Sequence, residues 1–167
     1  MSSLLRSDIT ALAKEAISLC IERNRTFGTA ESCTGGLIAA AVTDIPGASS
    51  VFYGGIVSYV NEVKHGILGV KNETLDRFTA VSEETAAEMA NGARKVLGVD
   101  FAVAVTGFAG PGGGTPEKPV GTVCVAVASQ SGVTVTENHF EGDREAVRLQ
   151  TVLKALSLLT ETVRKEA

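Results

Sequence analysis

The sequence predicts one α/β domain, a three-layer α/β/α sandwich built on a mixed β-sheet. Amphipathic helical segments lie between and after several short apolar segments rich in β-branched residues, and the last two of those segments are joined at hairpin spacing. A chain of 167 residues is long enough for one sizeable core and too short for two ordinary domains. We therefore expect a single domain over residues 1–167.

The N-terminal segments are predicted to form a helix, a strand and a second helix. Apolar residues recur at helical spacing over residues 7–24, with Ser7 or Asp8 near the N-cap of the helix. The short apolar stretch TFGTA then leads through ESCTGG into the helical segment LIAAAVTDI, which Pro46 and Gly47 end. This order predicts a strand, a tight turn and a helix.

The middle of the chain is predicted to contain a strand and two helices. Residues 51–60 are rich in β-branched and aromatic residues, as is typical of a strand. The segment NEVKHGILGV then predicts a short helix closed by Gly69, and ETLDRF predicts a turn. Ser82 precedes an acidic first turn, which predicts a helix that runs to Gly98.

The last third of the chain is predicted to supply three strands and a long helix. The nearly continuous apolar run at 101–107 is typical of a strand covered on both faces. The strands GTVCVAVAS and VTVTENHF are joined by Ser131 and Gly132, which predicts an antiparallel pair. Asp143 is expected to cap the final helix. The segment FAGPGGGTPEKP is too rich in glycine and proline to be regular.

Composition and charge exclude several classes of protein. Apolar residues make up 44% of the chain and charged residues 20%, and no segment offers the run of about 18 apolar residues that a membrane span needs. The net charge is −4 and the Lys and Arg residues are scattered, which argues against a nucleic-acid partner. The N-terminal segment is amphipathic, unlike a secretory signal. We expect a soluble, cytoplasmic protein with neither a membrane nor a nucleic-acid partner.

The three cysteines, Cys20, Cys33 and Cys124, are widely spaced, and the chain has only two histidines. This pattern argues against a disulfide framework and against a zinc site. Cys20 and Cys124 lie in apolar segments and are expected to be buried thiols. Only Cys33 lies in a segment where a reactive group is expected.

Three polar segments follow the ends of predicted strands: ESCTGG, VSYVNEVKHG and VTGFAGPGGGTPEKP. Ligands of open α/β sheets bind beyond the strand ends, so the three segments are expected to converge. A fourth segment, EGDREAVR, adds Arg144 and Arg148 at a helix start. This pair is expected either to grip a phosphate or a carboxylate or to lie on the surface.

Each of these segments has a catalytic and a purely structural interpretation. ESCTGG matches neither GxSxG nor a P-loop, and it either caps a helix or exposes a nucleophile where backbone amides bind an oxyanion. Lys64 is either a solvated helix lysine or a base whose pKa is lowered by burial. The glycine-rich loop is either a flexible connection or a segment whose amides approach a ligand closely.

Four motifs, in order, resemble those of the CinA C-terminal domain family, the PncC-type nicotinamide mononucleotide deamidases: TAESCTGG, YGGIVSYVNEVK, VTGFAGPGGGTPEKPVGTV and GDREAVR. The resemblance implies hydrolysis of the carboxamide of nicotinamide mononucleotide to nicotinic acid mononucleotide and ammonia, in pyridine nucleotide salvage. It implies no metal and no organic cofactor. Larger family members carry an extra N-terminal domain that resembles molybdopterin-biosynthesis proteins, and any activity of that domain is expected to be absent.

The resemblance also implies the roles of individual residues. A serine and a lysine that act as a pair in the family fall on Ser32 and Lys64, a tyrosine falls on Tyr59, and the arginine of the GDR motif falls on Arg144. Cys33 remains a rival nucleophile that is expected to pack inward.

The substrate is expected to meet three parts of the chain. Glu31 is expected to contact or orient it, and the helix start at residues 34–36, after Ser32, is expected to hold the oxyanion. The loop of residues 110–115 is expected to bind the phosphate. The expected substrate-binding residues are Glu31, Thr34, Gly35, Gly36, Thr106, Gly107, Gly110, Gly112, Gly113 and Thr115.

Two other functions fit the same motifs. One is a non-catalytic nucleotide-binding or regulatory module, and the other is an amidase of the same mechanism that acts on another small amide. Lys64 distinguishes the first from an enzyme, because a binding module has little need of a lysine with a lowered pKa beside a serine. The apolar stripe on the long C-terminal helix predicts a homodimer or a higher homo-oligomer.

Overall fold

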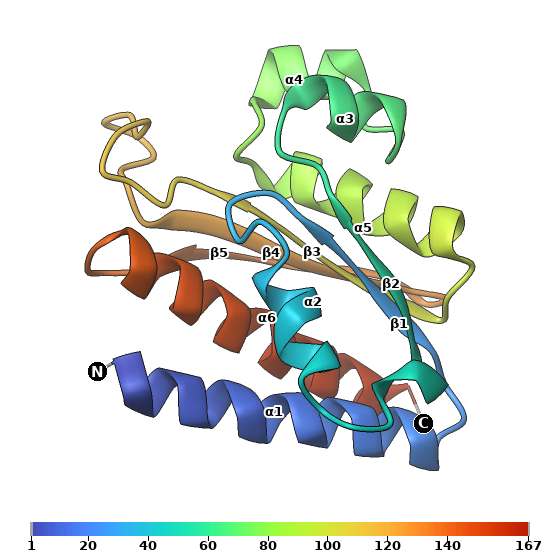
Figure 1. Ribbon diagram of the computed structural model, residues 1–167. Coiled ribbons are helices and arrows are strands. Elements are labelled where there is room, and N and C mark those ends of the chain that lie inside the picture. Colours follow the sequence, from blue (N-terminus) through green and yellow to red (C-terminus); the bar gives the residue numbers. More distant parts are fainter. Residues whose placement is uncertain (1, 167) are drawn as a thin grey trace.

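Five strands form one mixed sheet in the order β2-β1-β3-β4-β5 in the computed structural model, which describes residues 2–166 (Figure 1). β1 lies parallel to β2 and to β3, whereas β4 is antiparallel to both β3 and β5. The predicted hairpin is confirmed as the connection between β4 and β5. The strands are β1 (Phe27–Glu31), β2 (Phe52–Val57), β3 (Phe101–Gly107), β4 (Thr122–Ser129) and β5 (Gly132–His139).

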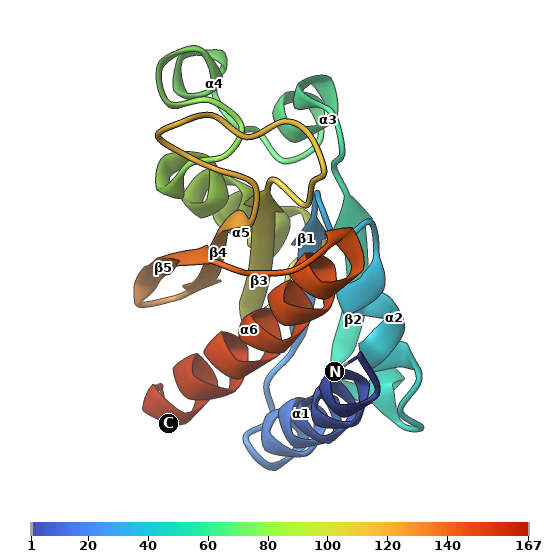
Figure 2. The same cartoon turned by 90° about the vertical axis from the view of Figure 1, so that its left-hand side faces the viewer.

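Helices cover both faces of this sheet, which confirms the predicted α/β/α sandwich. Helices α1, α2 and α6 pack on one face, and α5 packs on the other (Figure 1). Helices α3 and α4 lie beyond α5 at one end of the sheet, near the long loop that follows β3 (Figure 2). The helices are α1 (Ser2–Glu22), α2 (Leu37–Thr43), α3 (Asn61–Gly66), α4 (Asn72–Phe78), α5 (Glu83–Leu97) and α6 (Arg144–Lys165), with a 3₁₀ turn at Ala48–Ser50.

The two faces of the central strands differ in the size of their side chains. In β3, Val103 and Val105 enter the core under α1, α2 and α6, whereas Ala102 and Ala104 enter the core under α5. The buried face of α5 is also built largely of alanine, at Ala86, Ala90 and Ala93. Small side chains on both surfaces allow α5 to pack closely against the sheet.

Close packing continues where α5 meets the segment after α3. A Cβ atom added to Gly92 would lie 1.8 Å from the carbonyl oxygen of Leu68 and 2.7 Å from its carbonyl carbon. Both are backbone atoms, so they move only if the segment moves. Gly92 therefore allows α5 to contact the segment that follows α3. Because α3 carries Lys64, α5 supports the part of the chain next to this residue.

The predicted start of the first helix is wrong. The helix begins at Ser2, and Ser7 and Asp8 lie inside it. Arg6 forms an ion pair of 2.8 Å with Glu145 at the start of α6, and this contact ties the first turns of α1 to a neighbour that the local sequence does not reveal.

The predicted ETLDRF turn is also wrong, because this segment forms α4. The backbone amide of Lys71 and the hydroxyl of Thr74 donate to the carboxylate of Glu88, at 2.8 and 2.6 Å. Glu88 belongs to α5, so a distant side chain supplies the acceptors that stabilise the start of this short helix.

The predicted starts of α5 and α6 and the predicted end of α5 are confirmed. Ser82 accepts from the amide of Thr85 and Asp143 accepts from the amide of Ala146, so both are N-caps. Gly98 ends α5 with φ of 64°, a left-handed conformation that favours glycine.

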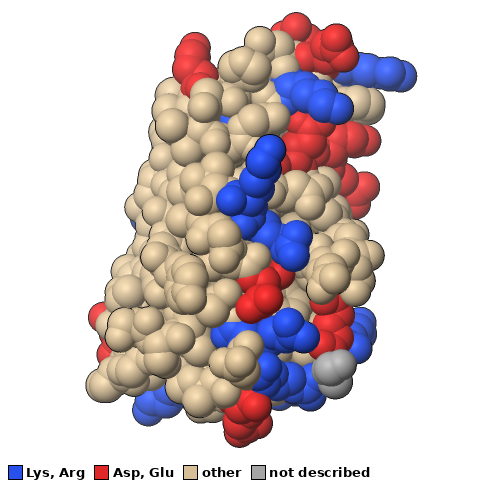
Figure 3. Space-filling view, turned by 90° about the vertical axis from the view of Figure 1, so that its right-hand side faces the viewer, with Lys and Arg blue, Asp and Glu red and all other residues tan. Residues whose placement is uncertain are grey.

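The described surface carries charges of both signs. On the face shown in Figure 3, Lys and Arg side chains lie next to Asp and Glu side chains. Among residues 2–166, no helix is both long enough and apolar enough to cross a membrane. The three cysteines are buried free thiols, as expected for Cys20 and Cys124.

Two glycine substitutions test the packing of α5. We expect Gly92→Ala to lower the free energy of unfolding by about 1–3 kcal/mol, because the new methyl group overlaps backbone atoms of Leu68. Gly66→Ala, where nothing lies within 4 Å, is expected to leave stability unchanged or to raise it. Thermal unfolding of both variants checks this, and equal melting temperatures would contradict the close approach.

Candidate active site

The carboxyl ends of the parallel strands β1, β2 and β3 lie at one edge of the sheet, as expected. The segments that follow these strands, together with the start of α6, enclose a cavity of about 250 Å³. Ser32, Tyr59, Lys64 and Arg144 all line it. The structure thus brings together, in one cavity, the four residues that are expected to be catalytic.

The side chains of Ser32 and Lys64 meet inside this cavity. The Nζ atom of Lys64 lies 3.1 Å from the Oγ atom of Ser32. Lys64 is only 1% exposed, and burial lowers the pKa of its amine. A lysine in this setting is neutral at a lower pH than an exposed one.

Two backbone carbonyls fix the orientation of the amine. Nζ donates to the carbonyl oxygens of Ser58 at 2.9 Å and of Tyr59 at 3.2 Å. A neutral amine has two N–H groups and one lone pair. When the amine is neutral and both N–H groups donate to these carbonyls, its lone pair is left for the hydroxyl of Ser32.

Strand pairing places the two segments that carry this pair side by side. The amide of Ser58 donates to the carbonyl of Glu31 at 2.8 Å, which extends the pairing of β1 and β2 by one residue. Ser32 begins the turn after β1, and α3 begins shortly after Ser58. Ser32 and Lys64, which are 32 positions apart in the sequence, are therefore brought together by a sheet contact immediately beside the site.

Arg144 lies at the mouth of the cavity and joins two of its walls. Its Nη1 atom donates to the carbonyl of Gly110 at 2.7 Å, and its Nη2 atom donates to the hydroxyl of Tyr59 at 3.2 Å. Tyr59 is 57% exposed. The guanidinium therefore connects the start of α6 with the glycine-rich loop and with the segment between β2 and α3.

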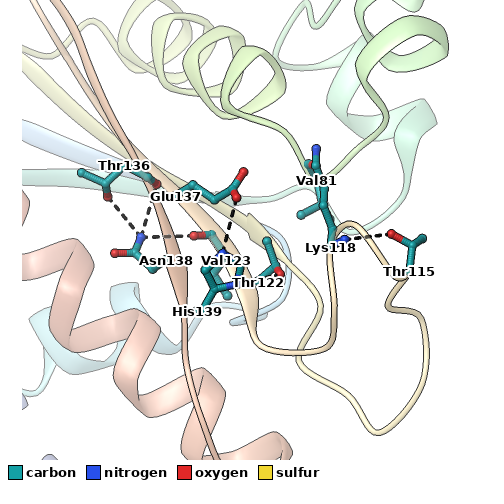
Figure 4. Close-up of polar contacts among 9 residues, drawn as sticks. All are labelled: Val81, Thr115, Lys118, Thr122, Val123, Thr136, Glu137, Asn138 and His139. Atoms are coloured by element: carbon teal, nitrogen blue, oxygen red, sulfur yellow. Dashed lines mark hydrogen bonds and ion pairs between the residues drawn. The ribbon is translucent and has the colours of Figure 1, made fainter.

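Only part of the glycine-rich loop faces the cavity. Gly107, Gly110 and Gly112 line it, whereas Gly113 and Thr115 do not. Thr115 closes a local turn in which its hydroxyl accepts from the amide of Lys118 (Figure 4). Its own amide donates to the carbonyl of Lys118. The tip of the loop therefore forms hydrogen bonds within itself.

The loop and strand β3 also hold a further wall of the cavity. The Nζ atom of Lys118 donates to the carbonyl of Val81 at 2.6 Å. The hydroxyl of Thr106, which lines the cavity, donates to the carbonyl of Ala80 at 2.7 Å. These two contacts hold Ala80 and Val81 against the cavity from the side of α5.

Glu31, Thr34, Gly35 and Gly36 do not line the cavity. The buried carboxylate of Glu31 accepts from the hydroxyl of Thr34 at 2.6 Å and from two backbone amides of α2. The amide of Gly35 donates to the carbonyl of Ser32. Of the amides at residues 34–36 that were expected to hold an oxyanion, that of Gly35 thus donates within the turn, and the carboxylate of Glu31 binds the later amides of Ile38 and Ala39.

Cys33 lines the cavity and also belongs to the core. Burial raises the pKa of its thiol to about 11, so the reactive thiolate is scarce at neutral pH. This environment favours the hydroxyl of Ser32 over the thiol as the nucleophile.

The cavity also has lining residues that the sequence analysis missed. Asn61 lies at the start of α3, and Phe108 follows β3. Both lie inside the recognised motifs, and a polar or aromatic side chain directly after a strand was an available signal. Ala80 and Val81 carried no such signal, because they are apolar residues between two helices.

Among residues 2–166, no group of three or more His, Cys, Asp and Glu side chains is arranged to hold a metal ion.

Solved structures with this fold cover nearly the whole chain. The competence/damage inducible protein CihA from Agrobacterium tumefaciens is 46% identical, with a TM-score of 0.90 over 94% of this chain and 96% of that chain. A competence-damaged protein (CinA) superfamily protein from Klebsiella pneumoniae 700603 is 36% identical, with a TM-score of 0.90 over 94% of this chain and 98% of that chain.

Curated relatives are similar over most of this chain but are much longer. A CinA-like protein from Leptospira borgpetersenii serovar Hardjo-bovis (strain L550) is 50% identical over 155 residues, 92% of this chain and 37% of that protein. A CinA-like protein from Fervidobacterium nodosum is 51% identical over 141 residues, 84% of this chain and 35% of that protein. The chain thus spans little more than a third of the length of these relatives.

The family comparison agrees with these similarities. The sequence description of the CinA C-terminal domain matches residues 9–163, which include every strand and the whole candidate site. This chain therefore belongs to the CinA C-terminal domain family.

Proposed function

We propose that this protein is an amidohydrolase that converts nicotinamide mononucleotide to nicotinic acid mononucleotide and ammonia. The observation that carries the proposal is the buried amine of Lys64, 3.1 Å from the hydroxyl of Ser32. A serine becomes a nucleophile when a neighbouring base accepts its proton, and a neutral lysine is such a base. The substrate itself is inferred from the family resemblance and from the guanidinium of Arg144, which lines the cavity and can bind a phosphate.

In the first half of the proposed reaction, Ser32 displaces ammonia from the carboxamide. The neutral amine of Lys64 accepts the hydroxyl proton as Oγ forms a bond to the carboxamide carbon. The resulting ammonium then donates a proton to the amide nitrogen as the C–N bond breaks. Ammonia leaves, and the nicotinoyl group remains as an ester on Ser32.

In the second half, water hydrolyses this ester. Lys64, neutral again, accepts a proton from water as the water oxygen forms a bond to the ester carbon. The bond between that carbon and Oγ breaks, and the proton returns from Lys64 to Ser32. The product is nicotinic acid mononucleotide, and both side chains regain their starting states.

Arg144 is proposed to bind the phosphate of the nucleotide and to support the base. Among the described residues that line the cavity, the basic side chains are Lys64 and Arg144. Arg144 donates to Gly110 and to Tyr59 at the cavity mouth, where a phosphate could take over these hydrogen bonds. Its charge also disfavours protonation of a lysine in the same cavity.

A non-catalytic nucleotide-binding module would use the same loop and the same arginine. It would gain nothing from a buried lysine amine that has lost its hydration and faces a serine hydroxyl. The contact between Ser32 and Lys64 therefore favours the enzyme over the binding module.

Removal of either member of the pair is expected to abolish turnover. Ser32→Ala and Lys64→Met should each lower kcat for nicotinamide mononucleotide by at least about 1000-fold, because the nucleophile or its base is lost. Release of ammonia and formation of the deamidated product are the measurements. Cys33→Ser is the matched control, since it changes the adjacent residue of the cavity and should keep kcat within about a factor of five. If Cys33→Ser is inactive and Ser32→Ala is active, the nucleophile is misassigned.

The pH dependence of the rate is expected to report the lowered pKa of Lys64. The reaction needs the neutral amine, so kcat/KM should rise with pH as Lys64 loses its proton and then level off. Because burial lowers this pKa, the midpoint of the rise should lie below the ordinary lysine value of about 10.4. Initial rates measured across the stable pH range check this, and a midpoint at the ordinary value would contradict the proposed base.

The proposed phosphate contact is tested by comparing two substrates. Arg144→Met should raise KM for nicotinamide mononucleotide by about 10-fold or more, because a charge-assisted contact with the phosphate is lost. For nicotinamide riboside, which lacks the phosphate, the increase in KM should be much smaller. Arg164→Met, at the far end of the same helix, is the control for the loss of a positive charge. Equal increases for both substrates would place the phosphate elsewhere.

A further inference from the structure

The turn that carries Ser32 is held from two sides by side chains that do not line the cavity. Residues 32–36 connect β1 with α2, and Gly35 and Gly36 adopt φ of 59° and 100°. Gly36 is the N-cap residue of α2 and has no side chain with which to cap it. The conformation of this turn therefore depends on contacts from elsewhere in the chain.

Glu31 supplies the contacts on one side. Its Oε1 atom accepts from the hydroxyl of Thr34 at 2.6 Å and from the amide of Ile38 at 2.9 Å. Its Oε2 atom accepts from the amide of Ala39 at 3.0 Å. Glu31 is 1% exposed, so these bonds lie in a setting where an unpaired carboxylate would be costly. The carboxylate thus joins the last residue of β1 to the turn and to the start of α2.

Arg148 supplies the contacts on the other side. Its Nε atom donates to the carbonyl of Cys33 at 3.1 Å, and its Nη2 atom donates to the carbonyl of Thr34 at 2.9 Å. These are the two residues that directly follow Ser32. The fork of the guanidinium matches two neighbouring acceptors, which a lysine ammonium cannot do from one position. Helix α6 thus holds the turn through one half-buried side chain.

We propose that Glu31 and Arg148 are positioning residues that together fix Ser32 at the distance from Lys64 that catalysis needs. We refer to the two side chains as the turn clamp. The proposal rests on the proposed hydrolase function, because it assigns the clamp an effect on the reactivity of Ser32. Neither side chain lines the cavity, so each acts on the reaction only through the turn.

The clamp and the base are held by different contacts. Lys64 is oriented by the carbonyls of Ser58 and Tyr59, which belong to the segment between β2 and α3. A weakened clamp should therefore displace Ser32 and leave the surroundings of Lys64 intact. A displacement of about 1 Å at a reacting group can cost roughly 100-fold in rate. The expected signature is a lower kcat, with little change in KM and no change in the pH midpoint.

Arg148→Lys tests this inference with a change of one side chain that keeps its charge. We expect kcat for nicotinamide mononucleotide to fall by at least about 10-fold, with KM within about a factor of three of the wild type. The midpoint of the pH profile should stay where it is in the wild type. A variant that was merely less stable would keep its kcat at temperatures well below its unfolding transition.

Arg23→Lys is the matched control. Arg23 also donates to two consecutive backbone carbonyls, those of Val163 and Arg164, far from the cavity. The same substitution there changes an arginine that binds two backbone carbonyls through its Nη1 atom, without touching the turn. If Arg148→Lys lowers kcat no more than Arg23→Lys, or if its whole effect lies in KM, the clamp does not position Ser32.

Glu31→Gln provides the second variant. Gln keeps the shape of the Glu side chain, but its NH₂ group replaces one of the two acceptor oxygens. This NH₂ group then faces a backbone amide or the hydroxyl of Thr34, which are themselves donors. We expect the same fall in kcat, accompanied by a lower melting temperature. If this variant does not fold, Arg148→Lys alone decides the question.

A substrate-independent measurement separates failure of the clamp from failure of the proposed function. A fluorophosphonate reacts with an activated serine, whose Oγ atom bonds to phosphorus as fluoride leaves and whose proton passes to the neighbouring base. The mass of the protein reports the rate of labelling at Ser32, and Arg148→Lys should label at least about 10-fold more slowly than the wild type and Arg23→Lys.

Each outcome of the two assays has a distinct meaning. Labelling of the wild type without hydrolysis of nicotinamide mononucleotide would contradict the proposed substrate, and the labelling rates would still test the clamp. Equal labelling rates for wild type and Arg148→Lys would overturn the clamp even if the wild type hydrolyses the substrate. A wild type that neither reacts nor labels would overturn both proposals, since Ser32 would not be activated.

Discussion

The buried amine of Lys64 is the constraint on which the site depends. An ammonium ion without water or a counter-charge is costly inside a protein, and the chain surrounds this amine with three neutral oxygens, from Ser32, Ser58 and Tyr59. Burial lowers the pKa of the amine, and the two carbonyls hold it beside the hydroxyl of the serine. The pairing of β1 with β2 and the position of α3 are what bring these groups together.

The different sizes of side chains on the two faces of the sheet explain how α3 is supported. Alanines under α5 allow that helix to approach the sheet closely, and Gly92 then allows the backbone at Leu68 to approach α5. The segment that follows Lys64 is thus packed against a helix that is itself packed tightly against the central strands. The position of the base is therefore linked to the core through backbone contacts, which yield less readily than side chains.

Local sequence was sufficient for the strands and for most of the helices. Hairpin spacing in the last third of the chain predicted the antiparallel pairing of β4 and β5, and side chains such as Ser82 and Asp143 marked helix starts. The errors occurred where a distant side chain decides the outcome. Glu88 stabilises the start of α4, and Arg6 joins the first turns of α1 to α6. Neither contact can be recognised from the residues that lie next to it in the sequence.

In the candidate site, too, some features could be predicted from the sequence and others could not. The resemblance to a family pointed to Ser32, Lys64, Tyr59 and Arg144, and these four side chains do line one cavity. The hydrogen bonds of Glu31 and Thr115 could not be predicted, because glutamates and threonines stabilise turns as readily as they bind ligands. The contacts of Arg148 with the turn could not be predicted either, since they depend on how α6 crosses the sheet.

The hydrogen bonds of Glu31 have one more consequence, which concerns the electrostatics of the base. Glu31 directly precedes Ser32, and an ion pair between its carboxylate and Lys64 would raise the pKa of the amine and hold its proton in place. The helix start of α2 and the hydroxyl of Thr34 occupy this carboxylate instead. The partial positive charge of those amides offsets the negative charge of Glu31. The hydrogen bonds at the start of this short helix therefore also weaken the electrostatic effect of Glu31 on Lys64.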